Sequence, residues 1–143
     1  MLRTYFATNG KETSRVMKKG DILEGRVIRT DFPNKGIVEV QTEDDSIYVT
    51  VKNALPGQTV KCLVNKKKHG HAEGRLLEVK EPAIVEEESA CPHYGACGGC
   101  LYQTYPYEEQ LKIKAGQIER LLRPVLESYD GKLVWEDVFE GIQ

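Results

Sequence analysis

The chain has 143 residues and a formal net charge of −2, with 40% hydrophobic and 29% charged residues. This length suffices for one medium domain, or for a small domain with an appendage, and the composition is that of an ordinary soluble globular protein. No apolar run in the sequence approaches the ~20 residues that a membrane-spanning helix needs, and the N-terminus lacks the apolar core of a secretory signal. We therefore expect a cytoplasmic protein without a membrane partner, in which cysteines bind metals more often than they form disulfides.

The charge is unevenly distributed along the chain. Residues 10–80 carry 14 Lys and Arg against 10 Asp and Glu, a net charge of +4. Residues 81–143 carry 5 against 12, a net charge of −7. A basic first half joined to an acidic second half indicates two modules with different partners.

The first half has the pattern of a small β domain. Residues 1–17 are polar, and we expect a flexible arm there. Residues 18–80 alternate β-branched runs with turn residues, including a basic loop at 66–71. The runs predict five strands, at 22–30, 37–40, 47–51, 60–64 and 75–79. Five short strands without helical periodicity between them favour an OB-like β-barrel, a common platform for nucleic acids.

The second half predicts a helix, so that the fold class is α+β. Residues 81–90 are expected to form a linker, and residues 91–143 a cysteine-rich segment with a helix that opens at Tyr105-Pro106. Pro124 is expected to end or kink this helix, and residues 132–140, with Trp135 as a core or interface anchor, are expected to form a strand. Apolar residues recur at steps of three and four and predict a helix face that packs in the core: Leu111, Ala115, Ile118, Leu122 and Val125.

Three cysteines follow the linker in a C-x5-C-x2-C pattern, at Cys91, Cys97 and Cys100. Thiolates this close repel one another unless a cation neutralises them, and the glycines between them allow sharp turns around a bulky group. One interpretation is a [4Fe–4S] cluster with a fourth ligand from elsewhere. The second is structural zinc completed by His93, and the third is three reduced thiols without a metal.

The remaining cysteine and histidines carry weaker signals. Cys62 lies within an apolar strand pattern, where cysteine usually acts as a small core residue, so we do not assign it as a ligand. His69 and His71 are expected to be exposed polar residues. The first gap of five residues also differs from the C-x3-C-x2-C of radical enzymes that use S-adenosylmethionine, so we do not predict a radical site.

The cysteine loop and its surroundings resemble a known family. Residues 91–103, followed by residues 107–112 and Lys114, are similar to the cluster-binding segment of the RNA (uracil-5-)-methyltransferases, in particular the bacterial 23S ribosomal RNA enzymes. Upstream, residues 55–57, 66–68 and 73–78 resemble the TRAM domain, an OB-like RNA-binding barrel that precedes the cluster in that family. Together the matches span about residues 18–126.

The resemblance implies a [4Fe–4S] cluster on Cys91, Cys97 and Cys100, with the family's fourth cysteine beyond Gln143. It also implies methyl transfer from S-adenosylmethionine to uracil C5 in the complete enzyme, where a cysteine adds to C6. The sequence contains neither the glycine-rich cofactor loop nor any cysteine after Cys100. We therefore expect an inactive N-terminal fragment with no catalytic residue, whose missing catalytic domain would bind S-adenosylmethionine. A free-standing zinc-stapled RNA-binding module remains the alternative.

The barrel is the expected RNA reader, for ribosomal RNA or, as the alternative, transfer RNA. Its cations would contact phosphates and provide salt-dependent affinity rather than sequence choice. These cations are Lys18, Lys19, Arg26, Arg29, Lys66, Lys67, Lys68 and Arg75. Phe32 and Tyr48 are candidates for stacking on unpaired bases, although barrels also use aromatic residues in their cores. The tyrosines near the cysteines are expected to shield the metal from water.

Overall fold

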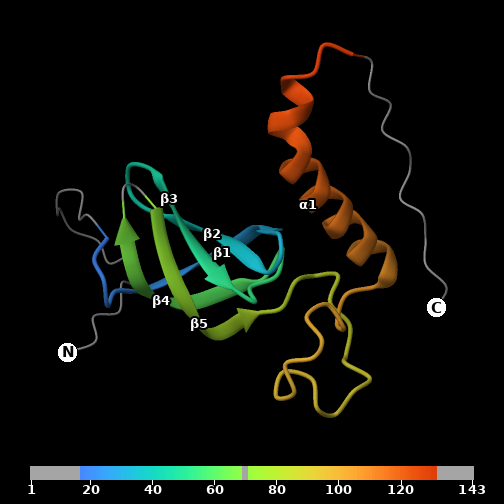
Figure 1. Ribbon diagram of the computed structural model, residues 1–143. Coiled ribbons are helices and arrows are strands. Elements are labelled where there is room, and N and C mark those ends of the chain that lie inside the picture. The colour runs from blue at the N-terminus through green and yellow to red at the C-terminus, as the bar shows by residue number, and fades with distance from the viewer. Residues whose placement is uncertain (1–16, 69–70, 132–143) are drawn as a thin grey trace. The chain divides into compact units, whose positions relative to one another are not determined.

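The computed structural model describes residues 17–68 and 71–131, with only the backbone described at Lys68 (Figure 1). The chain divides into two compact units, with the boundary between Ile84 and Val85. The predictions for the N-terminal arm up to residue 16, for His69, and for a strand at 132–140 with Trp135 lie outside the described residues. Within the described ranges, no helix is long and apolar enough to cross a lipid bilayer.

The first unit is a closed barrel of five strands (Figure 1). Its strands are β1 (Ile22–Asp31), β2 (Lys35–Gln41), β3 (Ser46–Lys52), β4 (Thr59–Lys68) and β5 (His71–Glu81). Their order around the barrel is β1-β2-β3-β5-β4, and β4 pairs with β1 to close it. The β3–β5 pair is parallel and the other pairs are antiparallel. This mixed barrel followed by one helix confirms the predicted fold class.

Alternation along the strands produces the barrel core. Strand β2 buries Val38 and Val40, and strand β3 buries Val49 and Val51, while Glu39 and Thr50 between them are half-buried. Fully burying a valine contributes about 1.5–3 kcal/mol, so a core built of valines is the main stabilising feature of the unit. The complete core cluster is Leu23, Val27, Val38, Val40, Val49, Val51, Ala54, Val60, Cys62, Val64 and Ala72.

The predicted basic loop at 66–71 is wrong in its extent. Residues 66–68 belong to β4, and His71 already begins β5. Cross-strand pairs continue to the end of this hairpin, with Lys66 opposite Glu73 and Lys67 opposite Ala72. The long backbone ladder therefore overrides the low strand propensity of a lysine run.

The second unit contains an irregular segment followed by α1 (Tyr107–Glu127). The helix begins directly after Pro106, and Glu108 and Glu109 occupy its first turn, where carboxylates interact favourably with the helix dipole. Of the two alternatives predicted for Pro124, an end of the helix is wrong, because α1 continues through it to Glu127, and a kink stays a prediction. A proline near a helix end removes few backbone hydrogen bonds.

The expected core face of α1 is also wrong in part. Leu111 and Ala115 are half-buried, but Ile118, Leu122 and Val125 are exposed to 45%, 41% and 64%. The buried residue of the helix is Gln117. Apolar periodicity correctly predicted a helix, but the second half of its apolar stripe is exposed.

Candidate functional site

Tight turns shape the cysteine loop. The backbone N–H of Tyr94 bonds to the Cys91 carbonyl at 3.2 Å, and the N–H of Cys97 bonds to the His93 carbonyl at 2.9 Å. Gly95 and Gly98 have φ angles of 84° and 71°, in the left-handed region that other residues avoid. These two glycines therefore allow a short segment to reverse direction between Cys91 and Cys100.

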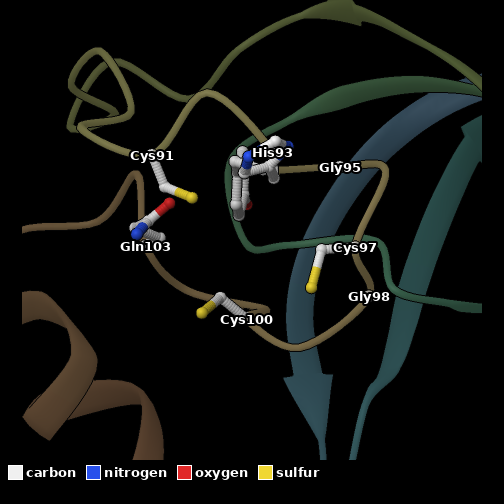
Figure 2. Close-up of a pocket in the computed structure, with 8 residues that line it drawn as sticks. Cys91, His93, Gly95, Cys97, Gly98, Cys100 and Gln103 are labelled. Atoms are coloured by element: carbon white, nitrogen blue, oxygen red, sulfur yellow. The ribbon is translucent and has the colours of Figure 1, made fainter.

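The loop gathers its three cysteines around one small pocket (Figure 2). Cys97 and Cys100 are exposed, and Cys91 is half-buried. The pocket is lined by Cys91, His93, Tyr94, Gly95, Cys97, Gly98, Cys100 and Gln103. Three thiols and one imidazole thus share a single pocket, which is a set of donors suited to iron or zinc.

The donors match a metal site in kind but are not already arranged as one. Among residues 17–68 and 71–131, no three His, Cys, Asp or Glu side chains lie close enough together to hold a metal ion. Binding would therefore require the sulfur atoms of Cys91, Cys97 and Cys100 to converge. Because Cys97 and Cys100 are exposed, their side chains can rotate without displacing a packed core.

Hydrogen bonds join the two arms of the loop, which are the segment that leads into Cys91 and the segment that follows Cys100. The Ser89 hydroxyl lies 2.7 Å from Gln103 Oε1 and accepts a bond from the Cys91 backbone N–H at 3.3 Å. Nearby, the Glu87 N–H donates to the Thr104 carbonyl at 2.7 Å. The arms are thus held together at their base, so the positions of the cysteines are restricted before any ligand binds.

Tyrosines and glutamines connect the loop to α1. Gln110 Nε2 donates to the carbonyls of Tyr102 and Tyr105, at 3.1 and 2.9 Å, and Gln117 Nε2 donates to the Tyr102 hydroxyl at 3.0 Å. The rings of Tyr102 and Tyr105 meet edge to face, with 6.4 Å between their centroids. The amphipathic helix therefore anchors the arm that follows Cys100.

Among the residues of this unit that the structure describes, Tyr105 is the most buried aromatic, at 3% exposure. Its hydroxyl donates to Glu86 Oε1 at 3.3 Å, and burial, followed by the nearby Glu86 carboxylate, strongly raises the pKa of Tyr105. Tyr105 is therefore neutral across the physiological range and acts as a packing residue. Of the tyrosines near the cysteines, Tyr94 is the one that lines the pocket.

Cys62 lies in β4 within the barrel core and is fully buried. Burial raises the pKa of its thiol to about 11, which keeps it neutral at physiological pH. A buried neutral thiol is neither reactive nor ready to bind a metal. This environment agrees with the interpretation of Cys62 as a core residue.

The predicted RNA-binding cations lie on β1, β4 and β5 and in the segment that precedes β1. Their side chains, apart from the undescribed Lys68, are all exposed: Lys18, Lys19, Arg26, Arg29, Lys66, Lys67 and Arg75. Several have acidic or backbone partners. Arg29 Nε lies 3.1 Å from Asp31 Oδ1, Lys66 Nζ lies 4.0 Å from Glu73 Oε2, and Lys67 Nζ donates to the Met17 carbonyl at 3.1 Å.

Three neighbouring strands, β1, β2 and β3, place polar residues opposite one another, namely Arg26, Glu39 and Tyr48. Arg26 pairs with Glu39, and Glu39 pairs with Tyr48. Tyr48 is 51% exposed, and its hydroxyl donates to Glu39 Oε1 at 3.3 Å. The Glu39 carboxylate raises the pKa of Tyr48. Phe32, the other predicted stacking residue, is 55% exposed between β1 and β2.

Sequence reasoning missed three residues of these sites. Strand alternation would have placed Glu39 on the outer surface, beside the cations, because Val38 and Val40 point inward. No sequence pattern marked Ser89, and Gln103 entered only as the last residue of the segment that resembles the cluster-binding family, since the pairing of the two depends on how the loop folds back on itself. Gln103 is moreover separated from Ser89 by 14 residues.

Comparison with known proteins connects both parts of the chain to one class of enzyme. No protein-family model matches the chain. It is 37% identical over 115 residues to an uncharacterized RNA methyltransferase of Clostridium tetani, and 41% identical over 106 residues to one of Caldanaerobacter subterraneus. It is also 32% identical over 114 residues to the 23S rRNA (uracil(1939)-C(5))-methyltransferase RlmD of a Marinomonas species.

The chain is related to the N-terminal portion of RNA methyltransferases. The three matches cover 80%, 74% and 80% of this chain but only 24%, 23% and 25% of the relatives. The chain thus spans about a quarter of the length of the curated relatives it matches. A match over 115 residues of a 143-residue chain must span residues 29–115 wherever it begins, so it includes most of the barrel and the whole cysteine loop.

Proposed function

We propose that this chain is the RNA-binding and iron–sulfur-binding part of an S-adenosylmethionine-dependent RNA (uracil-5-)-methyltransferase that acts on 23S ribosomal RNA. The observation that carries the proposal is the pocket lined by Cys91, Cys97 and Cys100, within a segment shared with RNA methyltransferases. In this assignment the three thiols hold a [4Fe–4S] cluster, and the fourth ligand comes from outside the chain. The bound cluster would fix the shape of the loop, which is a structural role.

The barrel is assigned the RNA-binding role. Its exposed cations attract phosphates, and Tyr48 and Phe32 expose large aromatic rings on which unpaired bases can stack. The division of the chain into two compact units, with the boundary between Ile84 and Val85, supports the assignment of RNA binding and cluster binding to different modules. The relatives named 23S rRNA methyltransferases support ribosomal RNA as the partner.

RNA binding is tested by titrating a structured ribosomal RNA fragment with the chain at increasing salt concentrations. We expect weak binding whose affinity falls as salt rises, because phosphate contacts release counterions. An acidic polymer without bases, such as polyglutamate, serves as the control for charge alone. Equal affinity for RNA and polyglutamate, or affinity that does not depend on salt, would refute the RNA-binding role.

Zinc is the second candidate for the cysteine loop, because His93 lines the same pocket as the three cysteines. A Cys3His set would complete a tetrahedral site within this chain. Elemental analysis after anaerobic purification separates the two metals. Iron with inorganic sulfide supports the cluster, and zinc without sulfide supports the zinc-stapled RNA-binding module. A preparation that contains neither iron nor zinc would refute both assignments.

A further inference from the structure

A hydroxyl and an amide bridge the two arms of the cysteine loop. Ser89 Oγ lies 2.7 Å from Gln103 Oε1 and 3.2 Å from the Cys91 carbonyl oxygen, and it accepts a bond from the Cys91 N–H. A hydroxyl has one hydrogen to donate, and the shorter distance assigns it to Gln103. Ser89 thereby connects the backbone of Cys91 with a residue three positions after Cys100.

We infer that Ser89 and Gln103 are positioning residues that set the place of Cys91 relative to Cys97 and Cys100. The inference rests on the proposed function, in that these cysteines are the metal ligands. Gln103 lines the pocket, and Figure 2 shows its side chain pointing toward that of Cys91. Loss of the bridge would free the Cys91 arm, and groups that orient metal ligands typically change metal affinity 10–100-fold.

The bridge can be removed without unfolding the loop. The Tyr94 hydroxyl still donates to the Leu101 carbonyl, and the Glu87 N–H still donates to the Thr104 carbonyl. Gln110 continues to hold the arm after Cys100 against α1. Substitutions at Ser89 and Gln103 therefore act on the geometry of the pocket more than on the fold of the unit.

The test uses cobalt(II) as the probe, because its absorption reports bonds to thiolate sulfur directly. The whole chain and its Ser89→Ala, Gln103→Leu and double variants are titrated with cobalt without oxygen. We expect each single variant to bind cobalt 10–100-fold more weakly. The double variant should bind cobalt about as tightly as the single variant with the lower affinity, since both substitutions break one shared interaction. Ser89→Thr, which keeps the hydroxyl, should retain affinity close to that of the original chain.

Ser128→Ala is the matched control, because it removes a hydroxyl that bonds to the Val125 carbonyl at the end of α1. It should leave cobalt binding unchanged. The positioning role is refuted, while the metal site stands, if Ser89→Ala and Gln103→Leu bind cobalt as tightly as the original chain. It is also refuted if the losses of binding free energy in these two variants simply add in the double variant. If the original chain shows no sulfur-to-cobalt absorption, the proposed metal site and the positioning role both fail.

Discussion

The hydroxyl of Tyr94 donates a hydrogen bond to the backbone carbonyl of Leu101, with 2.9 Å between the two oxygens. The two residues flank Cys97 and Cys100 in the sequence, so this single bond closes the part of the loop that carries them. Tyr94 also lines the pocket. The ring of Tyr94 lines the pocket and its hydroxyl closes the loop, so a substitution that removes only the hydroxyl tests the hydrogen bond alone.

Tyr94→Phe should weaken metal retention modestly. The ring remains in the pocket, and the lost hydrogen bond is worth about 1 kcal/mol, which corresponds to about a fivefold loss of affinity. Competition with a chelator under anaerobic conditions measures the change. Tyr129→Phe is the control, because Tyr129 is 57% exposed beyond the end of α1. A change as large for Tyr129→Phe as for Tyr94→Phe would contradict a specific role for the hydrogen bond between Tyr94 and Leu101.

Thiol labelling should separate Cys62 from the other cysteines. At pH 8 the metal-free chain should react rapidly at Cys91, Cys97 and Cys100, because they are exposed or half-buried, and at Cys62 only after unfolding. Mass spectrometry of the labelled peptides identifies the modified residues. Rapid labelling of Cys62 in the folded chain would show that the barrel core is open.

The Cys62 thiol should also make stability depend on pH in the alkaline range. Burial raises its pKa from 9.0 to about 11, so the folded chain holds this proton more tightly than the unfolded chain. The resulting stabilisation is complete below about pH 9 and is lost as the pH rises toward 11. Urea unfolding should therefore show a steeper loss of stability over this range for the original chain than for Cys62→Ala. Parallel curves would contradict the burial of a neutral thiol.

Neutralising two lysines on β4 should weaken RNA binding. Lys66→Gln with Lys67→Gln removes two exposed cations, and each phosphate contact to single-stranded RNA contributes about 0.7 to the slope of log K against log salt. We expect the slope to fall in magnitude by roughly 1.4. The control, Lys112→Gln with Lys114→Gln, makes the same charge change on α1 and should leave the slope unchanged. The reverse pattern would place the phosphate contacts on the second unit.

Tyr48 offers a test for base stacking. Tyr48→Ala should weaken binding to single-stranded RNA by about 1–3 kcal/mol, because stacking on an aromatic ring is worth that much per base. Tyr48→Phe keeps the ring and loses only the bond to Glu39, so it should bind like the original chain. Fluorescence anisotropy with a short unpaired oligonucleotide measures both. Equal binding by Tyr48→Ala would remove this residue from the RNA path.

Local patterns in the sequence were sufficient for the barrel but not for the lengths of its elements. The β-branched runs placed β2 and β3 correctly, because β-branched side chains favour strands and the valines of these two strands are buried in the barrel. The hairpin at Lys66–Lys68 was shortened in the prediction, since strand pairing with β5 extends a segment whose own propensity is weak. Likewise, the periodicity of α1 indicated a helix but not that Gln117 would be its buried residue.

The sequence predicted which cysteines lie together, but it did not predict the residues that support the loop around them. The cysteine spacing identified Cys91, Cys97 and Cys100 as neighbours, and these residues do line one pocket. The bridge between Ser89 and Gln103 depends on the return path of the chain, which spacing does not encode. The distance between sulfur atoms depends on side-chain rotations as well, so the sequence predicted a donor set rather than a geometry.

The central claim is that the cysteine loop binds an iron–sulfur cluster, and anaerobic reconstitution of the chain with iron and sulfide tests it most directly. After removal of unbound ions, iron and acid-labile sulfide should remain in equal amounts, with a visible absorption that disappears in Cys97→Ser with Cys100→Ser. Retention of neither ion by the original chain, or equal retention by the double variant, would contradict the claim.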